Sequence, residues 1–506
     1  MSGFVVIYGN PKRGQLDAMF NRISHRGSRW QEVYASPNIM MAQNYLDADI
    51  PGASDDLKIF GNHGPDIDLK ICYDGQMGNW PELAARYGIP RGPLQEESLI
   101  LKLYQKQGTG MFHYLNDALF ALVISNGDQL LVARDLLGIK TLFYGWQDGN
   151  LYLGSELKSL VPVIDEVFEF PAGCYMDQKG QIFRFAELPQ KPPQVAHTDL
   201  NQIVEDIRDI IQRSVTNRLD FQVKTGSLLS GGIDSSVIAS LASQAYHNRF
   251  GPDARLPTFA LGVGESQDII NARLMARHLN SDHAELVVGL EEVLAVLPEV
   301  VYYLESFDPS LVRSAASNFL ISRYAREKGI QVLLSGEGGD EVFCGYLYLK
   351  QYPLAELFAR QMECLGFLHN NASLRLDRMN LANSIRVVAP LISGELLEYS
   401  LALPAEYKQK PEGEGKIEKW IFRKAFEDLL PPEVVWRLKQ EFSQGSGSAE
   451  VLPRYFEKVI SDAELSQAQS QFPMVRSKEE LYYFQIFTEH FGHGRALDTV
   501  GQWVCL

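Results

Sequence analysis

The heptapeptide 230–236, Ser-Gly-Gly-Ile-Asp-Ser-Ser, constrains the fold of this chain more than any other stretch. It lies between the largely apolar run 226–229 and an amphipathic stretch that begins at Val237. This order is typical of a strand, a tight turn and a helix. The two glycines carry no Cβ atoms that would keep a ligand off the backbone, and Ser235 and Ser236 can cap the helix. The sequence therefore predicts an α/β unit with a ligand-accessible turn at a helix start.

A turn of this kind suits an anion, above all a phosphate, because the first N–H groups of the helix have no intrahelical partner. Asp234 would repel a bare phosphate, so it suggests a Mg²⁺ ion between carboxylate and phosphate. The chain contains no Gly-x-x-x-x-Gly-Lys-Ser/Thr motif. The turn instead resembles the pyrophosphate loop of enzymes that cleave ATP between its α and β phosphates. On the heptapeptide alone, a plain glycine turn before a capped helix is an equal alternative.

The strand pattern divides the chain into two parts. Residues 1–188 carry short alternating or apolar runs separated by turn signals, for example 4–8, 118–125 and 151–153, which is typical of stacked sheets. The composition then shifts to Gln, Lys, Pro and His, which predicts a linker at 189–199.

In the second part, 200–506, strands alternate with helices. Apolar runs at 256–264, 284–289 and 330–335 are separated by helical patterns at 269–279 and 312–328. Such βαβ units predict a doubly wound parallel sheet with ligands at the carboxyl ends of its strands.

The length, the net charge and the cysteine content of the chain exclude several classes of protein. At 506 residues the chain is expected to form at least two domains, and its net charge of −16 argues against a nucleic-acid binder. The five cysteines are scattered without a Cys-x-x-Cys pair, which fits reduced thiols in the cytoplasm. The sequence shows no signal peptide and no membrane span.

A second informative stretch is 335–341, Ser-Gly-Glu-Gly-Gly-Asp-Glu, which also follows an apolar strand. Both turns should therefore lie at the same edge of the sheet. Glu337, Asp340 and Glu341 beside a phosphate site suit magnesium ligands or a base for an incoming amine. By itself the motif is better interpreted as an acidic glycine turn without a catalytic role. The phosphate turn expected beside it makes the functional interpretation the better one.

A third stretch, 436–445, places Lys439 in a sequence of aromatic residues and glycine, with Arg437 nearby. A lone lysine usually lies on the solvated surface. A cation is needed, however, to stabilise charge while an acyl adenylate forms and breaks down. Lys439 is therefore a candidate for that role, supported by Arg437.

Taken together, these motifs resemble the class B, glutamine-type asparagine synthetases over nearly the whole chain. In the first part the similar segments are 25–27, 133–140 and 155–158; in the second they are 230–236, 305–313, 335–343, 419–424 and 436–445. The resemblance implies an Ntn-hydrolase-like αββα domain of the glutamine amidotransferase type 2 kind at 1–188. It implies an adenine-nucleotide α-hydrolase-like ATP-pyrophosphatase domain at 200–506.

The resemblance also implies roles for individual residues. Glu337 and Lys439 would be catalytic, and Asp234 and Asp340 would hold Mg²⁺ and pyrophosphate. Binding of ATP or pyrophosphate would involve Leu229, Ser230, Gly231, Gly232, Asp234, Ser235, Ser236, Leu261, Gly336 and Gly338. The carboxylic-acid substrate would contact Ser310, Arg313 and Asp340.

Four departures from the family affect the first domain. The family's nucleophilic cysteine is Ser2 here, and its arginine for the glutamine carboxylate falls near Tyr45. The family's Asn-Gly-Glu reads 74–76 Asp-Gly-Gln, and its Ser-Asp reads 95–96 Gln-Glu. A serine can act as an N-terminal nucleophile, but tyrosine does not replace charge-paired recognition of a carboxylate. We therefore expect a silent glutaminase.

One departure affects the second domain. The family's Glu-x-Arg-x-Pro-Phe-Leu-Asp reads 386–393 Arg-Val-Val-Ala-Pro-Leu-Ile-Ser. The residues at the three charged positions of this pattern differ from those of the family. The difference puts aspartate in doubt as the acid substrate but does not affect the ATP chemistry.

The leading hypothesis is an ATP-dependent amide-forming ligase that adenylates a carboxylate, with aspartate as the first candidate. Free ammonia or an amine, rather than glutamine-derived nitrogen, would then displace AMP. ATP and Mg²⁺ are the expected cofactors, and a homodimer is compatible with the resemblance. One alternative is ring closure onto an amine of the substrate itself, as in β-lactam synthetases, which carry tyrosine in place of Glu337. A second alternative is a non-catalytic nucleotide-binding relative.

Overall fold

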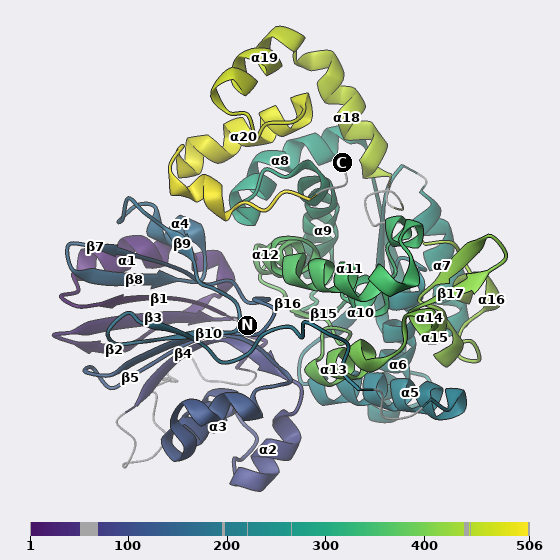
Figure 1. Ribbon diagram of the computed structural model, residues 1–506, viewed down its shortest axis with the longest axis horizontal. Helices are drawn as coiled ribbons and strands as arrows, with labels where there is room; N and C mark the ends of the chain where they lie inside the picture. The colour runs from purple at the N-terminus through teal and green to yellow at the C-terminus, as the bar shows by residue number, and fades with distance from the viewer. Residues whose placement is uncertain are drawn as a thin grey trace. The chain divides into compact units, whose positions relative to one another are not determined.

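A computed structural model describes residues 2–50, 69–194, 198–219, 221–264, 266–439, 445 and 447–503, except for the side chains of 30–33 and 448–450. Parts of the expected linker 189–199 and of the stretch 436–445 therefore lie outside the described residues. The chain forms two compact units. The first contains Met1–Leu188, Ser384–Arg386 and Phe491–Thr499, and the second contains the remainder (Figure 1).

The first unit is built on two antiparallel sheets, as the resemblance predicts. The strands are β1 (Ser2–Tyr8), β2 (Arg29–Ser36), β3 (Ile39–Tyr45), β4 (Lys70–Met77), β5 (Ala118–Ser125), β6 (Leu130–Arg134), β7 (Phe143–Gln147), β8 (Asn150–Gly154), β9 (Phe168–Glu169), β10 (Cys174–Asp177) and β11 (Ile182–Arg184). One sheet has the order β2-β3-β1-β8-β7-β9 and the other has the order β11-β10-β6-β5-β4. A single buried cluster, which includes Phe4 from the first sheet and Val123 from the second, joins their facing sides.

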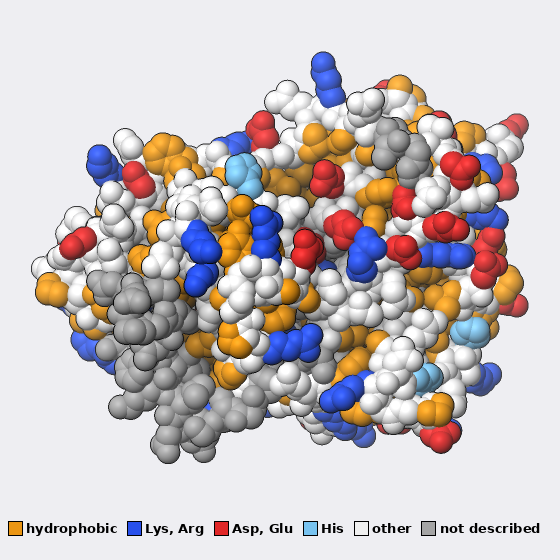
Figure 2. Space-filling view, turned by 90° about the horizontal axis from the view of Figure 1, so that it is seen from below, with side chains coloured by type: hydrophobic (Ala, Val, Ile, Leu, Met, Phe, Trp, Pro, Cys, Tyr) orange, Lys and Arg blue, Asp and Glu red, His pale blue; other side chains and the backbone are white. Residues whose placement is uncertain are grey.

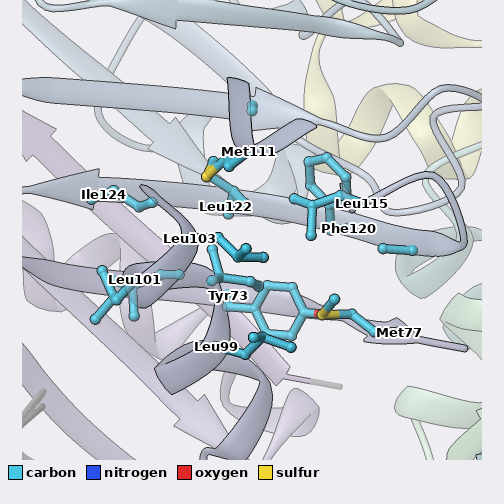
Figure 3. Close-up of a cluster of buried hydrophobic side chains, with 14 of the residues drawn as sticks. Tyr73, Met77, Leu99, Leu101, Leu103, Met111, Leu115, Phe120, Leu122 and Ile124 are labelled. Atoms are coloured by element: carbon cyan, nitrogen blue, oxygen red, sulfur yellow. The ribbon is translucent and has the colours of Figure 1, made fainter. Parts of the chain in front are cut away.

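Helices complete the αββα arrangement. They are α1 (Arg13–Asn21), η1 (Ser24–Arg26), α2 (Trp80–Tyr87), α3 (Gln95–Gln107), η2 (Gly108–Tyr114), α4 (Leu157–Leu160) and η5 (Arg495–Thr499). Figure 3 shows how α3 packs: Leu99 and Leu103 meet Tyr73 and Met77 of β4 and Leu122 of β5 in one buried cluster. The outward side of this sheet is thereby removed from water.

The second unit is built around a largely parallel sheet of order β14-β13-β12-β15-β16. Its strands are β12 (Thr225–Leu228), β13 (Pro257–Val263), β14 (Asp282–Val288), β15 (Val332–Leu334) and β16 (Arg386–Val388), and a separate hairpin contains β17 (Gln409–Glu412) and β18 (Gly415–Glu418). Because β12 pairs in parallel with both β13 and β15, the turns that follow β12 and β15 lie at the same edge. That sequence expectation is confirmed.

Helices alternate with these strands and then form most of the rest of the unit, as predicted. They are α5 (Leu200–Arg218), α6 (Ile233–Phe250), α7 (Gln267–Leu279), α8 (Leu290–Leu304), α9 (Pro309–Glu327), α10 (Gly339–Phe343), η3 (Leu347–Gln351), α11 (Leu354–Phe367), η4 (Leu368–Asn370), α12 (Ala372–Leu381), α13 (Gly394–Ala402), α14 (Ala405–Lys408), α15 (Trp420–Ala425), α16 (Pro432–Val435), α18 (Ser448–Val459), α19 (Asp462–Gln471) and α20 (Lys478–Phe491). The α6, α7 and α9 helices pack against the strands of the sheet.

The face seen in Figure 2 carries both acidic and basic side chains. Among the described residues, no helix is both long enough and apolar enough to cross a bilayer. The four described cysteines, Cys72, Cys174, Cys344 and Cys364, are buried and form no disulfide, and Cys505 lies outside the described residues.

A candidate adenylation site

The first glycine turn has the geometry of a close backbone approach. Gly231 has a φ of +68°, and a Cβ atom there would lie 2.4 Å from the backbone carbon of Asn271. The cap differs from the prediction: Gly232 is the N-cap of α6, and no side chain caps it. The Ser235 hydroxyl instead accepts a hydrogen bond from the Ser230 backbone N–H at 3.2 Å. The serine thus closes the turn rather than the helix end.

The second glycine turn packs directly on the first. A Cβ atom at Gly336 would lie 2.5 Å from the Ser235 nitrogen, and one at Gly339 would lie 2.2 Å from Asp234 Oδ1. Gly338 has a φ of +96°, which favours glycine. Only residues without side chains allow the two turns to come this close.

Four charged side chains meet where the turns touch. The Lys419 ammonium lies 2.6 Å from Asp234 Oδ2 and 2.7 Å from Asp340 Oδ1, and the Lys439 ammonium lies 2.7 Å from Asp340 Oδ2. Lys419 is fully buried. A Cβ atom at Gly345 would lie 1.9 Å from Lys419 Cε, so a glycine is required there for the lysine to reach the carboxylates.

The two lysines keep Asp340 ionised. Burial by itself would raise the pKa of Asp340, but Lys419 and Lys439 hold that pKa well below its ordinary value. Burial would lower the pKa of Lys439, but Asp340 and Asp234 raise it above its ordinary value. Asp340 and Lys439 therefore both stay charged at neutral pH.

Both turns line one cavity of about 140 Å³ that is partly open to solvent. Among the residues expected at the site, the cavity is lined by Leu229, Ser230, Gly232, Asp234, Ser235, Leu261, Gly336, Glu337, Gly338, Asp340 and Lys439. Gly231 and Ser236 do not line it; Ser236 is fully buried behind the turn. Phe259, Ala260 and Ile321 give the cavity an apolar side, which suits a nucleobase.

A smaller cavity of about 80 Å³ adjoins the first and shares Glu337, Asp340 and Lys439 with it. Ser310, expected near the acid, lines this second cavity. Arg313 does not line either cavity: its guanidinium binds both carboxylate oxygens of Glu479, at 2.5 to 3.1 Å. The substrate role of Arg313 stays a prediction, and this contact gives the residue a structural partner.

Some residues of the site escaped the sequence reasoning. Lys419 was recognised only as part of a matching stretch, and Arg375 and Tyr346 were given no role. Arg375 lines both cavities and its guanidinium lies 2.5 Å from Glu337 Oε1, so the expected catalytic carboxylate is held by a cation where the cavities meet.

The two aspartates have the chemistry of a magnesium site that is completed by phosphate. Mg²⁺ binds through one or two carboxylates together with phosphate oxygens and water. Among the described residues, none donates a hydrogen bond to the buried Asp234 Oδ1, which leaves this oxygen available for an ion. Within the described part of the chain no three His, Cys, Asp or Glu side chains cluster as a metal site, so phosphate oxygens would have to complete the ligand shell.

In the first unit, Ser2 is buried and held by hydrogen bonds. Ser2 is 2% exposed; its hydroxyl donates to the Tyr73 carbonyl at 2.9 Å and accepts from Gln43 at 2.6 Å. Its backbone N–H donates to Asp74 at 3.2 Å. Asp74, which replaces the family's asparagine, lies 2.6 Å from the buried guanidinium of Arg26.

This ion pair extends into a buried network. Arg26 also binds Glu156 at 2.7 Å, and Glu156 contacts Lys158 at 2.6 Å and His25 at 2.9 Å. Tyr45, near the position of the family's arginine, is 4% exposed. These side chains hold one another, and Tyr45 itself carries no charge for an incoming carboxylate.

The second glycine turn is supported from behind by a buried lysine. Lys408 donates to Gln361 at 2.7 Å, and Gln361 donates to the backbone carbonyls of Glu341 and Val342 at 3.0 and 2.6 Å. Burial lowers the pKa of Lys408 from 10.5 to about 8. The folded protein therefore carries a costly buried charge below that pH.

Lys408→Met is expected to change how stability depends on pH. Between about pH 8 and 10.5 the unfolded wild type keeps the Lys408 proton that the folded state has released, so the free energy of unfolding of the wild type should rise relative to that of the variant, by about 3 kcal/mol in total. Thermal melts of both proteins across this range test it, because other titrating groups cancel in the difference. Parallel Tm curves would contradict the buried charge.

Comparison with known proteins agrees with this geometry. The family model for asparagine synthase matches residues 206–365 and 356–503, and the model for a glutamine amidotransferase domain matches residues 1–203. The chain is 33% identical over 486 residues to asparagine synthetase B [glutamine-hydrolyzing] of Escherichia coli (strain K12), covering 92% of this chain and 86% of the relative. It is 30% identical over 507 residues to asparagine synthetase [glutamine-hydrolyzing] of Zea mays, covering 97% of this chain and 85% of the relative. The chain therefore belongs to the asparagine synthase family, whose members are ATP-dependent carbon–nitrogen ligases.

Proposed function

We propose that this chain forms an amide from a small carboxylic acid, with aspartate as the first candidate, and from nitrogen that does not come from glutamine. The observation that carries the first half is the convergence of both glycine turns with Asp234, Asp340 and Lys439 on one cavity. The adjoining second cavity provides space for an acid beside the same charges.

The chemistry proceeds in two steps. A carboxylate oxygen of the acid bonds to the α-phosphorus of ATP, the bond from that phosphorus to the bridging oxygen breaks, and pyrophosphate leaves. A nitrogen nucleophile then bonds to the acyl carbon, and the bond from that carbon to the bridging oxygen of the adenylate breaks. AMP leaves with that oxygen, and Glu337 takes the proton released by the nitrogen. Lys439 balances negative charge in both steps.

Residues of the two turns hold the leaving pyrophosphate. The start of α6 provides N–H groups, which favour a phosphate anion. Asp234 and Asp340 would hold Mg²⁺, which when bound neutralises phosphate charge during cleavage. Lys419 keeps the two carboxylates in place by contacting both.

The second half of the proposal rests on the first unit. We assign residues 1–188 to a glutamine amidotransferase-like domain that no longer supplies ammonia, and residues 200–506 to the synthetase domain. A buried Ser2 with two hydrogen-bond partners at its hydroxyl supports this assignment, as does the Asp74–Arg26 pair. Free ammonia or an amine is then the nitrogen source.

Exchange of labelled pyrophosphate into ATP tests the adenylation step. Aspartate together with MgATP is expected to support exchange without any nitrogen donor, because acyl adenylate formation is reversible. A panel of other small acids identifies a better substrate if aspartate is slow. Binding of ATP with no acid-dependent exchange for any member of the panel would instead indicate a non-catalytic nucleotide-binding protein.

A further inference from the structure

Trp503 forms a wall of the second cavity although it lies far from the motifs in sequence. The cavity is lined on one side by Ser310 and Ser314 of α9 and at its reacting end by charged residues. Tyr346 and Trp503 provide aromatic side chains in the same lining, and their ring centroids are 5.9 Å apart. The cavity thus combines a polar side, a charged end and an aromatic surface.

The position of the indole is fixed by its aromatic neighbours. Its ring centroid lies 5.2 Å from that of Phe367 and 6.3 Å from that of Tyr348. The backbone before it approaches closely too, since a Cβ atom at Gly501 would lie 2.8 Å from Phe367. Rings packed at these separations keep Trp503 in one orientation.

A buried carboxylate ties the Trp503 backbone to the start of α9. Asp308 accepts a hydrogen bond from the Trp503 backbone N–H at 2.9 Å and caps α9 by accepting from Leu311 at 3.0 Å. Arg476 binds the same carboxylate at 2.9 Å and donates to the Trp503 carbonyl at 3.0 Å. One aspartate therefore positions both the start of α9, which carries Ser310, and Trp503.

We infer that Trp503 is a specificity-determining residue that packs against the carbon skeleton of the acid and limits its length. The inference rests on the proposed function, because it assumes that the acid occupies the second cavity. The substrate class is an amino acid with a side-chain carboxylate, which would place its reacting carboxylate near Lys439 and its body against the indole.

Trp503→Ala tests this with three acids that differ by one methylene each: aspartate, glutamate and 2-aminoadipate. In the variant, KM for the best of them is expected to rise about tenfold while kcat changes little, because a ground-state contact is lost. The ratio of kcat/KM for the next longer acid to that for the best one is expected to rise about tenfold or more, in line with the cost of one misfitted methylene in an apolar pocket. Pyrophosphate release measures both.

Two further variants separate a specificity role from a merely structural one. Trp503→Phe keeps an aromatic ring and should retain most of the wild-type preference among the three acids. If the alanine variant is unstable, this variant provides the test, and a lost preference in it would contradict the inference. Trp146→Ala removes a 46% exposed indole in the first unit and should leave KM and preference unchanged.

The outcomes distinguish this inference from the proposed function. A wild type that adenylates an acid, with an unchanged preference in a folded Trp503→Ala variant, overturns only the inference. Loss of activity toward all three acids in equal proportion in that variant also overturns it. A wild type that adenylates none of a broad panel of acids refutes the proposed function, and the inference falls with it.

Discussion

Asp234→Ala is expected to lower the rate of pyrophosphate formation about a thousandfold, the size of effect seen when an oriented charged or polar group is removed from a reacting centre. Asp234 projects from the first turn of α6 toward the second glycine turn, where Asp340 lies. Without its carboxylate, one expected magnesium ligand is lost and Lys419 keeps only Asp340 as a described acidic partner. Pyrophosphate release under saturating ATP measures the loss.

Two controls make this result interpretable. Asp234→Asn preserves the size of the side chain and should lose activity to a similar degree, while thermal melts report whether either variant folds. Asp209→Ala removes an exposed aspartate on α5 and should be as active as the wild type. Near-normal activity of a folded Asp234→Ala variant would show that the turn does not hold the phosphates as proposed.

Glutamine is expected to support no amide formation under conditions in which ammonium supports it fully. Nucleophilic attack needs a serine oxygen that is accessible and free to lose its proton, whereas the Ser2 hydroxyl donates its proton to the Tyr73 carbonyl and is 2% exposed. Recognition of the glutamine carboxylate would need a cation where the chain has Tyr45.

Ser2→Ala is the matched control for this claim. Because the serine is not used, the variant should form product from ammonium at the wild-type rate, and its release of glutamate from glutamine should equal the wild-type background. If the wild type released glutamate from glutamine and the variant did not, Ser2 would be an active glutaminase nucleophile and the claim would be wrong.

The sequence predicted those parts of the site that are local in the chain. Each glycine turn directly follows its own strand, so Asp234 and Asp340 could be placed at one sheet edge from the order of apolar runs alone. Lys419 could not be placed in this way, since its partner Asp234 lies 185 residues away. Arg375 was missed for the same reason: only the folded chain brings α12 to the turn that holds Glu337.

In the first unit, β2 and β3 were not predicted. β3 carries Gln43 and Asn44, which are fully buried polar residues that interrupt the expected alternation of apolar and polar side chains. Gln43 bonds to Ser2 and Tyr73, and Asn44 bonds to the Ile23 carbonyl, so the burial of both depends on partners that are distant in the sequence. The expected serine caps of α6 were replaced by a glycine N-cap because Ser235 is used to close the turn.

The most direct test of the whole account follows the nitrogen atom into the product. The wild-type protein is supplied with MgATP, its acid substrate and either ¹⁵N-ammonium or glutamine labelled at the amide nitrogen, and the product is examined by mass spectrometry. The account predicts an amide labelled from ammonium, formed together with AMP and pyrophosphate, and no label from glutamine. An amide labelled from glutamine, or one formed with ADP and phosphate, would contradict it.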